Sequence, residues 1–268
     1  MNQTSATPML SILLDWFVND PKILHFSWVK GETPASSPQF LTLTVVSYLS
    51  VTLFLSQNHP IFIAPPRLRR ITVVHNIILI VLSLIMAVGC LLSIFFHAPS
   101  IHHVLCYPKD VEPKGPLFFW AYVFYLSKIY EYVDTFLIVV SKSMKRLSFL
   151  HVYHHTTVVI MCYIGLHTSQ SSFPVVLVTN CMVHVIMYYY YLLCAIGKRP
   201  NWKRLVTDIQ ILQFFASFIN MAIVFFFHFT GSGCSGIWGY CFSMAFIITL
   251  LVLFIDFHFK NYNAKKDM

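Results

Sequence analysis

Three closely spaced histidines are the residues in this sequence best suited to chemistry. His151, His154 and His155 form an H-x-x-H-H pattern, and on an α-helix this spacing places the three imidazoles on one face. The flanking sequence is apolar over a length that crosses a membrane, where an ionisable side chain costs about 2.5–3.5 kcal/mol on translocon-insertion scales. Three histidines in such a segment, despite this insertion cost, indicate a functional site.

More polar residues stand in neighbouring apolar segments, again at helical spacing. Before the histidines, Lys128 and Glu131 share one helix face with the pair Asp134 and Thr135. After them come Asn180, His184, Met187, Tyr188, Tyr190 and Tyr191 in one segment, and Thr207, Gln210 and Gln213 in the next. Lys128 is suited to neutralising Glu131 or Asp134, because a buried unpaired charge is costly; a contact with a ligand anion is the alternative.

The histidine cluster allows two kinds of chemistry. Imidazoles bind iron or zinc, as in membrane diiron desaturases and hydroxylases, but a diiron site needs several such boxes and the sequence has one complete H-x-x-H-H. A mononuclear site would use His151, His154, His155 and His184. The other kind is acid–base or nucleophilic catalysis, in which Glu131 or Asp134 orients one ring nitrogen and leaves the other free. Histidines that only hold helices together by hydrogen bonds are the structural alternative.

Composition predicts an all-α integral membrane protein. Of the 268 residues, 57% are hydrophobic and 10% are charged, whereas soluble domains carry about 25% charged residues. Apolar runs of about 17–25 residues, the length of a transmembrane helix, recur at 38–56, 71–96, 117–140, 149–167, 173–196, 207–229 and 236–259. We therefore expect a single membrane domain, residues 38–259, with seven transmembrane helices and no nucleic-acid partner.

Basic residues give the expected orientation of these spans. They gather in the loops after the odd-numbered spans and in the tail, as Arg67, Arg69, Arg70, Lys142, Lys145, Arg146, Lys198, Arg199, Lys203, Arg204, Lys260, Lys265 and Lys266. The positive-inside rule then places residues 1–37 in the lumen and the tail, residues 260–268, in the cytosol. All four polar segments are consequently expected to meet in the cytosolic leaflet.

Two features outside the spans follow from this orientation. Cys106 and Cys234 fall on the oxidising side, where they form either a disulfide or two free thiols. Lys265 and Lys266 match the dilysine retrieval signal of endoplasmic-reticulum membrane proteins, which must face the cytosol to be read. The sequence therefore predicts a multi-pass protein of the endoplasmic reticulum membrane.

The polar segments together resemble the four signatures of the ELO family, the elongases of very-long-chain fatty acids. The signatures are Lys128-x-x-Glu131-x-x-Asp134-Thr135, His151-x-x-His154-His155, Asn180-x-x-x-His184-x-x-Met187-Tyr188-x-Tyr190-Tyr191 and Thr207-x-x-Gln210-x-x-Gln213, complete and in order. The resemblance runs from about residue 70 to 260, and the flanking sequences look most like the plant ELO-like branch. Two places differ from the common pattern: His75-Asn76 replaces Tyr-Asn, and Asp256-Phe257-His258 replaces Asn-Phe-Tyr.

This resemblance implies a seven-helix fold in which six helices enclose an acyl-chain tunnel. It also implies condensation of a long-chain acyl-CoA with malonyl-CoA, which releases CO2 and CoA and gives a 3-oxoacyl-CoA two carbons longer. Neither a cofactor nor a metal is expected. The expected partners are the ketoreductase, dehydratase and enoyl reductase of the elongation cycle, and a second copy of the chain is a further candidate.

The same resemblance suggests roles for the polar residues. The expected catalytic residues are His151, His154, His155, His184, Glu131 and Asp134, and the other residues of the four signatures are expected to bind substrate. In one hypothesis His154 or His184 attacks the thioester to give an acyl-imidazole, and decarboxylated malonyl-CoA then resolves it. A direct ternary reaction, with a histidine acting only as base, is the other possibility. A metal-dependent desaturase or hydroxylase and a seven-helix receptor are the competing classes of function.

Overall fold

The computed structural model describes residues 8–58 and 63–263, and these residues form helices and connecting loops, with one isolated β-bridge between Ser27 and Lys114. The first part contains α1 (Pro8–Phe17), α2 (Pro21–Leu24) and α3 (Pro38–Asn58). The second contains α4 (Pro65–Phe96), α5 (Ile101–Leu105), α6 (Pro116–Tyr130), α7 (Tyr132–Val140), η1 (Met144–Arg146), α8 (Phe149–His167), α9 (Phe173–Ala195), α10 (Lys203–Thr230), α11 (Ile237–His258) and η2 (Phe259–Asn263). The predicted all-α class is confirmed for the described residues.

Six of these helices are long and apolar enough to cross a membrane: α3, α4, α8, α9, α10 and α11. The run 117–140, expected as one span, is instead two consecutive helices that meet at Glu131. At the junction the Asp134 N–H donates to the Glu131 carbonyl oxygen at 3.0 Å, three residues back rather than four. The local tightening of the chain separates α6 from α7.

Proline starts several of the helices, which explains why they begin where they do. Pro65, Pro116 and Pro174 lie in the first turns of α4, α6 and α9, where the missing N–H would have had no helical partner. Charged residues extend two helices beyond the expected spans. Helix α4 begins six residues before position 71 and includes Arg67 to Arg70, and α10 begins at Lys203. Long basic side chains at a helix end can reach water, so the helix can extend beyond its apolar run.

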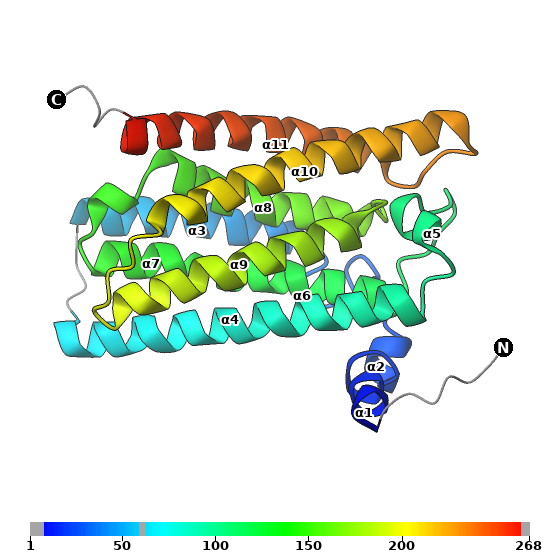
Figure 1. Ribbon diagram of the computed structural model, residues 1–268, viewed down its shortest axis with the longest axis horizontal. Coiled ribbons are helices and arrows are strands. Elements are labelled where there is room, and N and C mark those ends of the chain that lie inside the picture. Colours follow the sequence, from blue (N-terminus) through cyan, green and yellow to red (C-terminus); the bar gives the residue numbers. More distant parts are fainter. Residues whose placement is uncertain (1–7, 59–62, 264–268) are drawn as a thin grey trace.

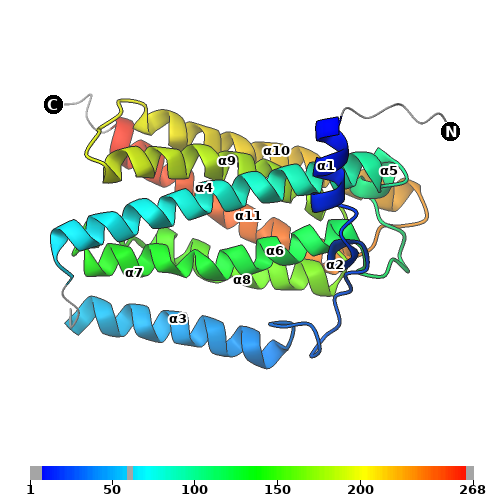
Figure 2. The same cartoon turned by 90° about the horizontal axis from the view of Figure 1, so that it is seen from below.

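The long helices lie side by side in one bundle whose ends differ (Figure 1). The C-terminal end of α3, the start of α4 and the links from α7 to α8 and from α9 to α10 lie at one end, which also carries Arg67, Arg69, Arg70, Lys142, Lys145, Arg146, Lys198 and Arg199. We call this the basic end. Helix α5 and the links from α8 to α9 and from α10 to α11 lie at the other end, and α1 and α2 pack beside it (Figures 1 and 2).

The second end is fastened by a disulfide between Cys106 and Cys234, and we call it the disulfide end. The two Cα atoms are 4.9 Å apart, although 128 positions separate the residues in the chain. Nearby, the turn from Thr168 to Ser172 carries four buried polar residues, Ser169, Gln170, Ser171 and Ser172. The Ser171 hydroxyl donates to the Ser235 carbonyl at 2.9 Å, so the turn is tied to the α10–α11 link. The disulfide and the turn from Thr168 to Ser172 thus form one cross-linked polar cluster at this end of the bundle, which we call the plug.

Both flanking segments contain short helices. Residues 1–37, expected as a lumenal segment, contain α1 and α2, and α1 lies across the direction of the long helices (Figure 2). At the other terminus η2 continues α11 to Asn263. Lys265 and Lys266 lie outside the described residues, so the dilysine signal stays a prediction.

Candidate active site

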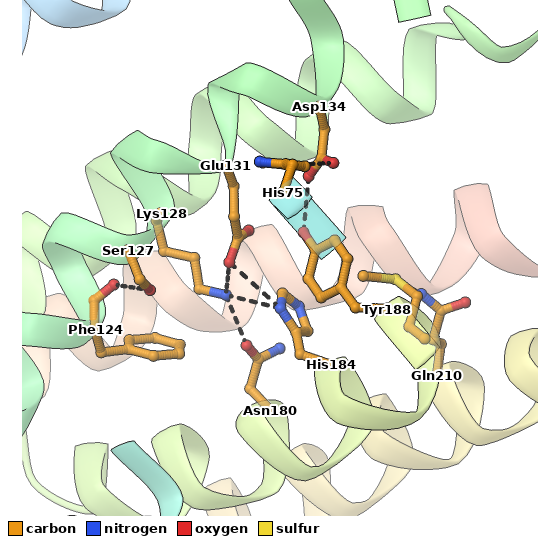
Figure 3. A network of polar contacts seen from close by, with 11 residues as sticks. His75, Phe124, Ser127, Lys128, Glu131, Asp134, Asn180, His184, Tyr188 and Gln210 are labelled. Carbon is orange, nitrogen blue, oxygen red and sulfur yellow. Dashed lines mark hydrogen bonds and ion pairs between the residues drawn. The ribbon is translucent and has the colours of Figure 1, made fainter. Parts of the chain in front are cut away.

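A buried ion pair lies where α6 meets α7. The Lys128 ammonium donates to Glu131 Oε1 at 2.8 Å, and the two side chains are 1% and 2% exposed. It also donates to Asn180 Oδ1 at 2.9 Å, on the neighbouring helix α9 (Figure 3). Two charges removed from water are stable only when paired and hydrogen-bonded, and the Lys128 contacts meet this requirement. The structure thus pairs Lys128 with Glu131, the first of the two roles considered for it.

His184 completes this cluster from α9. Its Nδ1 atom lies 3.3 Å from Glu131 Oε1 and 3.4 Å from Lys128 Nζ, and the residue is 6% exposed. With Nδ1 facing the carboxylate, the Nε2 atom of the ring points away from the ion pair. An imidazole held by a carboxylate through one nitrogen and open at the other has the arrangement of a base or nucleophile.

The histidine box lies on the first turns of α8. Ser148 caps this helix by accepting the backbone N–H of His151 at 3.2 Å, which starts the helix directly before the box. The His151 Nε2 atom is 2.8 Å from the Thr135 hydroxyl of α7, and that hydroxyl is 2.9 Å from the hydroxyl of Tyr48 on α3. The His155 ring centroid is 4.4 Å from that of His151. Three helices therefore hold the start of the box.

His154 differs from the other histidines of the site. Its ring centroid is 5.2 Å from that of His155, edge to face. Among the described residues no hydrogen bond is formed by its side chain, whereas those of His151 and His184 are each held. Both ring nitrogens of His154 are consequently available to hydrogen-bond a bound molecule.

Asp134 is held by residues of two other helices. Its Oδ1 atom is 2.9 Å from His75 Nε2 on α4, and its Oδ2 atom accepts the Tyr188 hydroxyl at 2.7 Å (Figure 3). The sequence marks His75 as a departure from the family pattern but does not indicate this contact. Nothing in the spacing of the motifs places α4 against α7, so the sequence does not identify His75 as a residue of the site.

The remaining signature residues lie nearer the basic end. Gln210 donates to the Met187 sulfur at 3.4 Å, and the hydroxyl of Thr207 is 3.3 Å from that of Tyr262 in η2. Tyr190 packs edge-on against Trp202, and Arg146 lies over the ring of Tyr191. Among the described residues the Gln213 side chain makes no hydrogen bond to the ion pair. The fourth signature thus borders the network rather than joining it.

Two polar atoms of the cluster are left open. Glu131 Oε2 and His155 Nδ1 are buried and have no hydrogen-bond partner among the described residues. A buried polar atom without a partner costs about 1–3 kcal/mol, so such atoms usually mark a place for water or for a ligand. In the described ranges, no group of three or more His, Cys, Asp or Glu side chains is arranged to hold a metal ion.

These features define an all-helical, multi-pass membrane protein with a buried cluster of ionisable residues and histidines with free ring nitrogens. Residues 33–268 match a family model whose description is "ELO: GNS1/SUR4 family". The chain belongs to this family, and the predicted family is confirmed.

Individual relatives agree with the family model. Fatty acid elongase A of Dictyostelium discoideum is 32% identical over 265 residues, 94% of each chain. Another D. discoideum protein, provisionally named a fatty acid elongase, is 34% identical over 253 residues, 90% of this chain and 82% of its own. Very long chain fatty acid elongase 5 of Xenopus tropicalis is 30% identical over 226 residues, 78% of this chain and 69% of its own. The predicted likeness to the plant branch finds no support in these relatives.

Proposed function

We propose that the Lys128–Glu131–His184 cluster, together with His154, is the active site at which acyl-CoA and malonyl-CoA are joined. The observation that carries this proposal is the buried carboxylate of Glu131, which faces Nδ1 of His184 at 3.3 Å, while the other ring nitrogen has no hydrogen bond among the described residues. The open atoms Glu131 Oε2 and His155 Nδ1 offer further places to hold a reacting group or its water.

The chain is a fatty acid elongase, the 3-oxoacyl-CoA synthase that condenses an acyl-CoA with malonyl-CoA. The reaction forms a carbon–carbon bond between the acyl carbonyl carbon and C2 of the malonyl group. CO2 leaves malonyl-CoA, and CoA leaves the acyl thioester. No electron is gained or lost overall, so the chemistry requires a nucleophile, a proton carrier and groups that stabilise developing negative charge.

In the proposed mechanism the Nδ1–H of His184 donates to Glu131, so that Nε2 carries the lone pair that attacks the thioester carbonyl. Nδ1 keeps its proton, so the acyl group remains on the ring as an acyl-imidazolium. CoA departs as a thiolate that takes up a proton from solvent. Lys128 keeps Glu131 ionised, because an ammonium at 2.8 Å stabilises the carboxylate in a buried site. Asn180 accepts from the same ammonium and fixes its direction.

The second half of the reaction uses malonyl-CoA as a carbon nucleophile. Loss of CO2 leaves an enolate, which attacks the acyl-imidazolium, releases the 3-oxoacyl-CoA and regenerates His184. The unbound ring of His154 is positioned for proton transfer to and from CoA. His151 is held by Thr135, so it serves as an oriented neighbour of His155 rather than as a mobile group. His154 as the nucleophile is the alternative that the experiment below separates.

We further propose that α6 and α7 together make the third of seven crossings, since residues 116–140 follow one another along the bundle (Figure 1). The basic end would face the cytosol, where Arg and Lys side chains attract the phosphates of CoA. The N-terminus would be lumenal, the C-terminus cytosolic, and the membrane that of the endoplasmic reticulum. Six helices around an acyl tunnel, and association with the other three enzymes of the cycle, are parts of the same proposal.

The mechanism is tested with purified enzyme and a long-chain acyl-CoA, without malonyl-CoA. Intact-protein mass spectrometry is expected to show one acyl adduct that disappears when malonyl-CoA is added. His184→Ala should abolish the adduct and His154→Ala should slow its formation. His97→Ala, which changes an exposed histidine at the end of α4, should leave it unchanged. An adduct that persists in the double variant His154→Ala/His184→Ala would rule out these two histidines as the nucleophile, and no adduct in the active wild type would favour the ternary reaction.

A further inference from the structure

His75 is a buried histidine of α4 that lies outside the four family signatures. It is 3% exposed, and both of its ring nitrogens face polar groups of other elements. Nε2 lies 2.9 Å from Asp134 Oδ1 on α7, and Nδ1 lies 3.3 Å from the hydroxyl of Tyr130 on α6. This pattern of contacts is too specific for a residue that merely fills space in an apolar interface.

The contacts of His75 continue toward His184. Asp134 uses its second oxygen to accept the Tyr188 hydroxyl at 2.7 Å, so both oxygens of the carboxylate are directed. Tyr188 lies one turn after His184 on α9, and the two rings meet edge to face with centroids 5.4 Å apart (Figure 3). A carboxylate fixed at both oxygens therefore locks the tyrosine ring that supports the imidazole.

We propose that His75 is a positioning residue for condensation, acting through Asp134 and Tyr188 on the orientation of the His184 ring. This inference rests on the active site proposed above. Removing the Nε2–H of His75 frees Asp134 to turn, and the Tyr188 ring then loses its anchor. Small errors in the placement of a reacting group are costly: a misplacement of about 1 Å lowers a rate by about 100-fold.

The experiment is a double-mutant cycle between His75 and Tyr188, with kcat and the KM for malonyl-CoA measured on each purified variant. His75→Phe keeps the ring volume and removes both nitrogens, and Tyr188→Phe removes the hydroxyl. Each is expected to lower kcat by about 10-fold or more with KM changed less than about twofold. Because the two residues act in series, the double variant should be no slower than the slower single variant.

Three further variants make the result decisive. His75→Gln, whose amide can still donate to Asp134, should recover most of the lost kcat. Tyr130→Phe removes only the longer contact, at 3.3 Å, and should leave kcat within about threefold of wild type. His75→Met replaces His75→Phe in the cycle if the phenylalanine variant does not accumulate as folded protein.

Two results would overturn the inference: a wild-type kcat in His75→Phe, or losses that multiply in the double variant. A purely structural role predicts lowered thermal stability without recovery by His75→Gln. An error in the proposed active site would be recognised separately: if the His184→Ala enzyme were active, the proposal that His184 belongs to the active site would be wrong. If His75→Phe kept the wild-type kcat while His184→Ala was inactive, only the positioning role of His75 would be wrong.

Discussion

Both halves of the bundle bury polar side chains, but they do so in opposite ways. Around the disulfide the turn from Thr168 to Ser172 belongs to a neutral, paired network: Ser172 donates to Asn220 at 2.8 Å, and Asn220 donates to the Tyr240 hydroxyl at 3.1 Å. The indole Nε1 of Trp28, outside this network, is buried without a partner among the described residues. In the half toward the basic end the groups are ionisable, and Glu131 Oε2 and His155 Nδ1 have no partner among the described residues.

The difference indicates what each region is for. A buried polar group that is fully paired costs little and fixes one arrangement of the helices, so the closed network stabilises the bundle. A buried polar atom without a hydrogen-bond partner lowers the stability of the protein, and a ligand that binds this atom removes the loss. We therefore expect changes at the disulfide end to alter stability first, and changes around Lys128 to alter catalysis first.

The largest effect is expected from Lys128→Met. The substitution removes the cation from a pair that is 1% and 2% exposed and leaves the Glu131 carboxylate buried without a counter-ion. We expect condensation to fall by more than about 1,000-fold and stability to drop by about 3–5 kcal/mol. Labelled malonyl-CoA incorporation and thermal unfolding in detergent measure the two effects.

A double variant separates the two losses. Lys128→Met/Glu131→Gln removes both charges, so most of the stability should return while condensation stays absent. Recovered activity in this double variant would show that the ion pair serves folding alone, and the two halves of the molecule would then not differ as described.

The next largest effect concerns the disulfide. Cys106→Ser/Cys234→Ser opens a loop of 128 residues, and we expect the free energy of unfolding to fall by about 2–5 kcal/mol. Condensation at 25 °C should change little, because the cross-link lies at the opposite end from the histidines. Unfolding of oxidised and reduced wild type gives the matched comparison. A selective loss of kcat in folded variant protein would connect the plug to the chemistry.

A smaller effect is expected inside the plug. Asn220→Leu leaves the Ser172 hydroxyl without its acceptor and the Tyr240 hydroxyl without its donor. Stability should fall by about 1–3 kcal/mol with kcat unchanged. Ser217→Ala is the control on the same helix, because within the described part of the chain its hydroxyl bonds to just the carbonyl oxygen of Gln213, one turn before it. Equal losses in the two variants would show that the Asn220 network contributes nothing beyond local packing.

The sequence predicts groupings within one helix and which segments supply the polar cluster, but it does not specify which side chains meet between helices. Helical spacing places Lys128 and Glu131 together, and the structure pairs them. Hydropathy likewise locates the long apolar helices, but it does not show the break at Glu131, which depends on one backbone hydrogen bond. The contact between His75 and Asp134 joins residues 59 positions apart. It depends on how α4 and α7 are rotated toward each other, and no local pattern encodes that rotation.

The smallest effect is expected from a residue that the sequence does not mark at all. Tyr48 of α3 reaches the histidine box only through Thr135, whose hydroxyl lies 2.9 Å from that of Tyr48 and 2.8 Å from His151 Nε2. Tyr48→Phe removes one of the two partners of Thr135, so kcat should fall by about threefold, while Thr135→Val removes the contact with His151 itself and should cost more. Thr135→Ser keeps the hydroxyl and is the matched control. If Tyr48→Phe were the more damaging variant, α3 would act on the active site by another route. The active-site network around Lys128 would then extend further than the hydrogen bonds described above indicate.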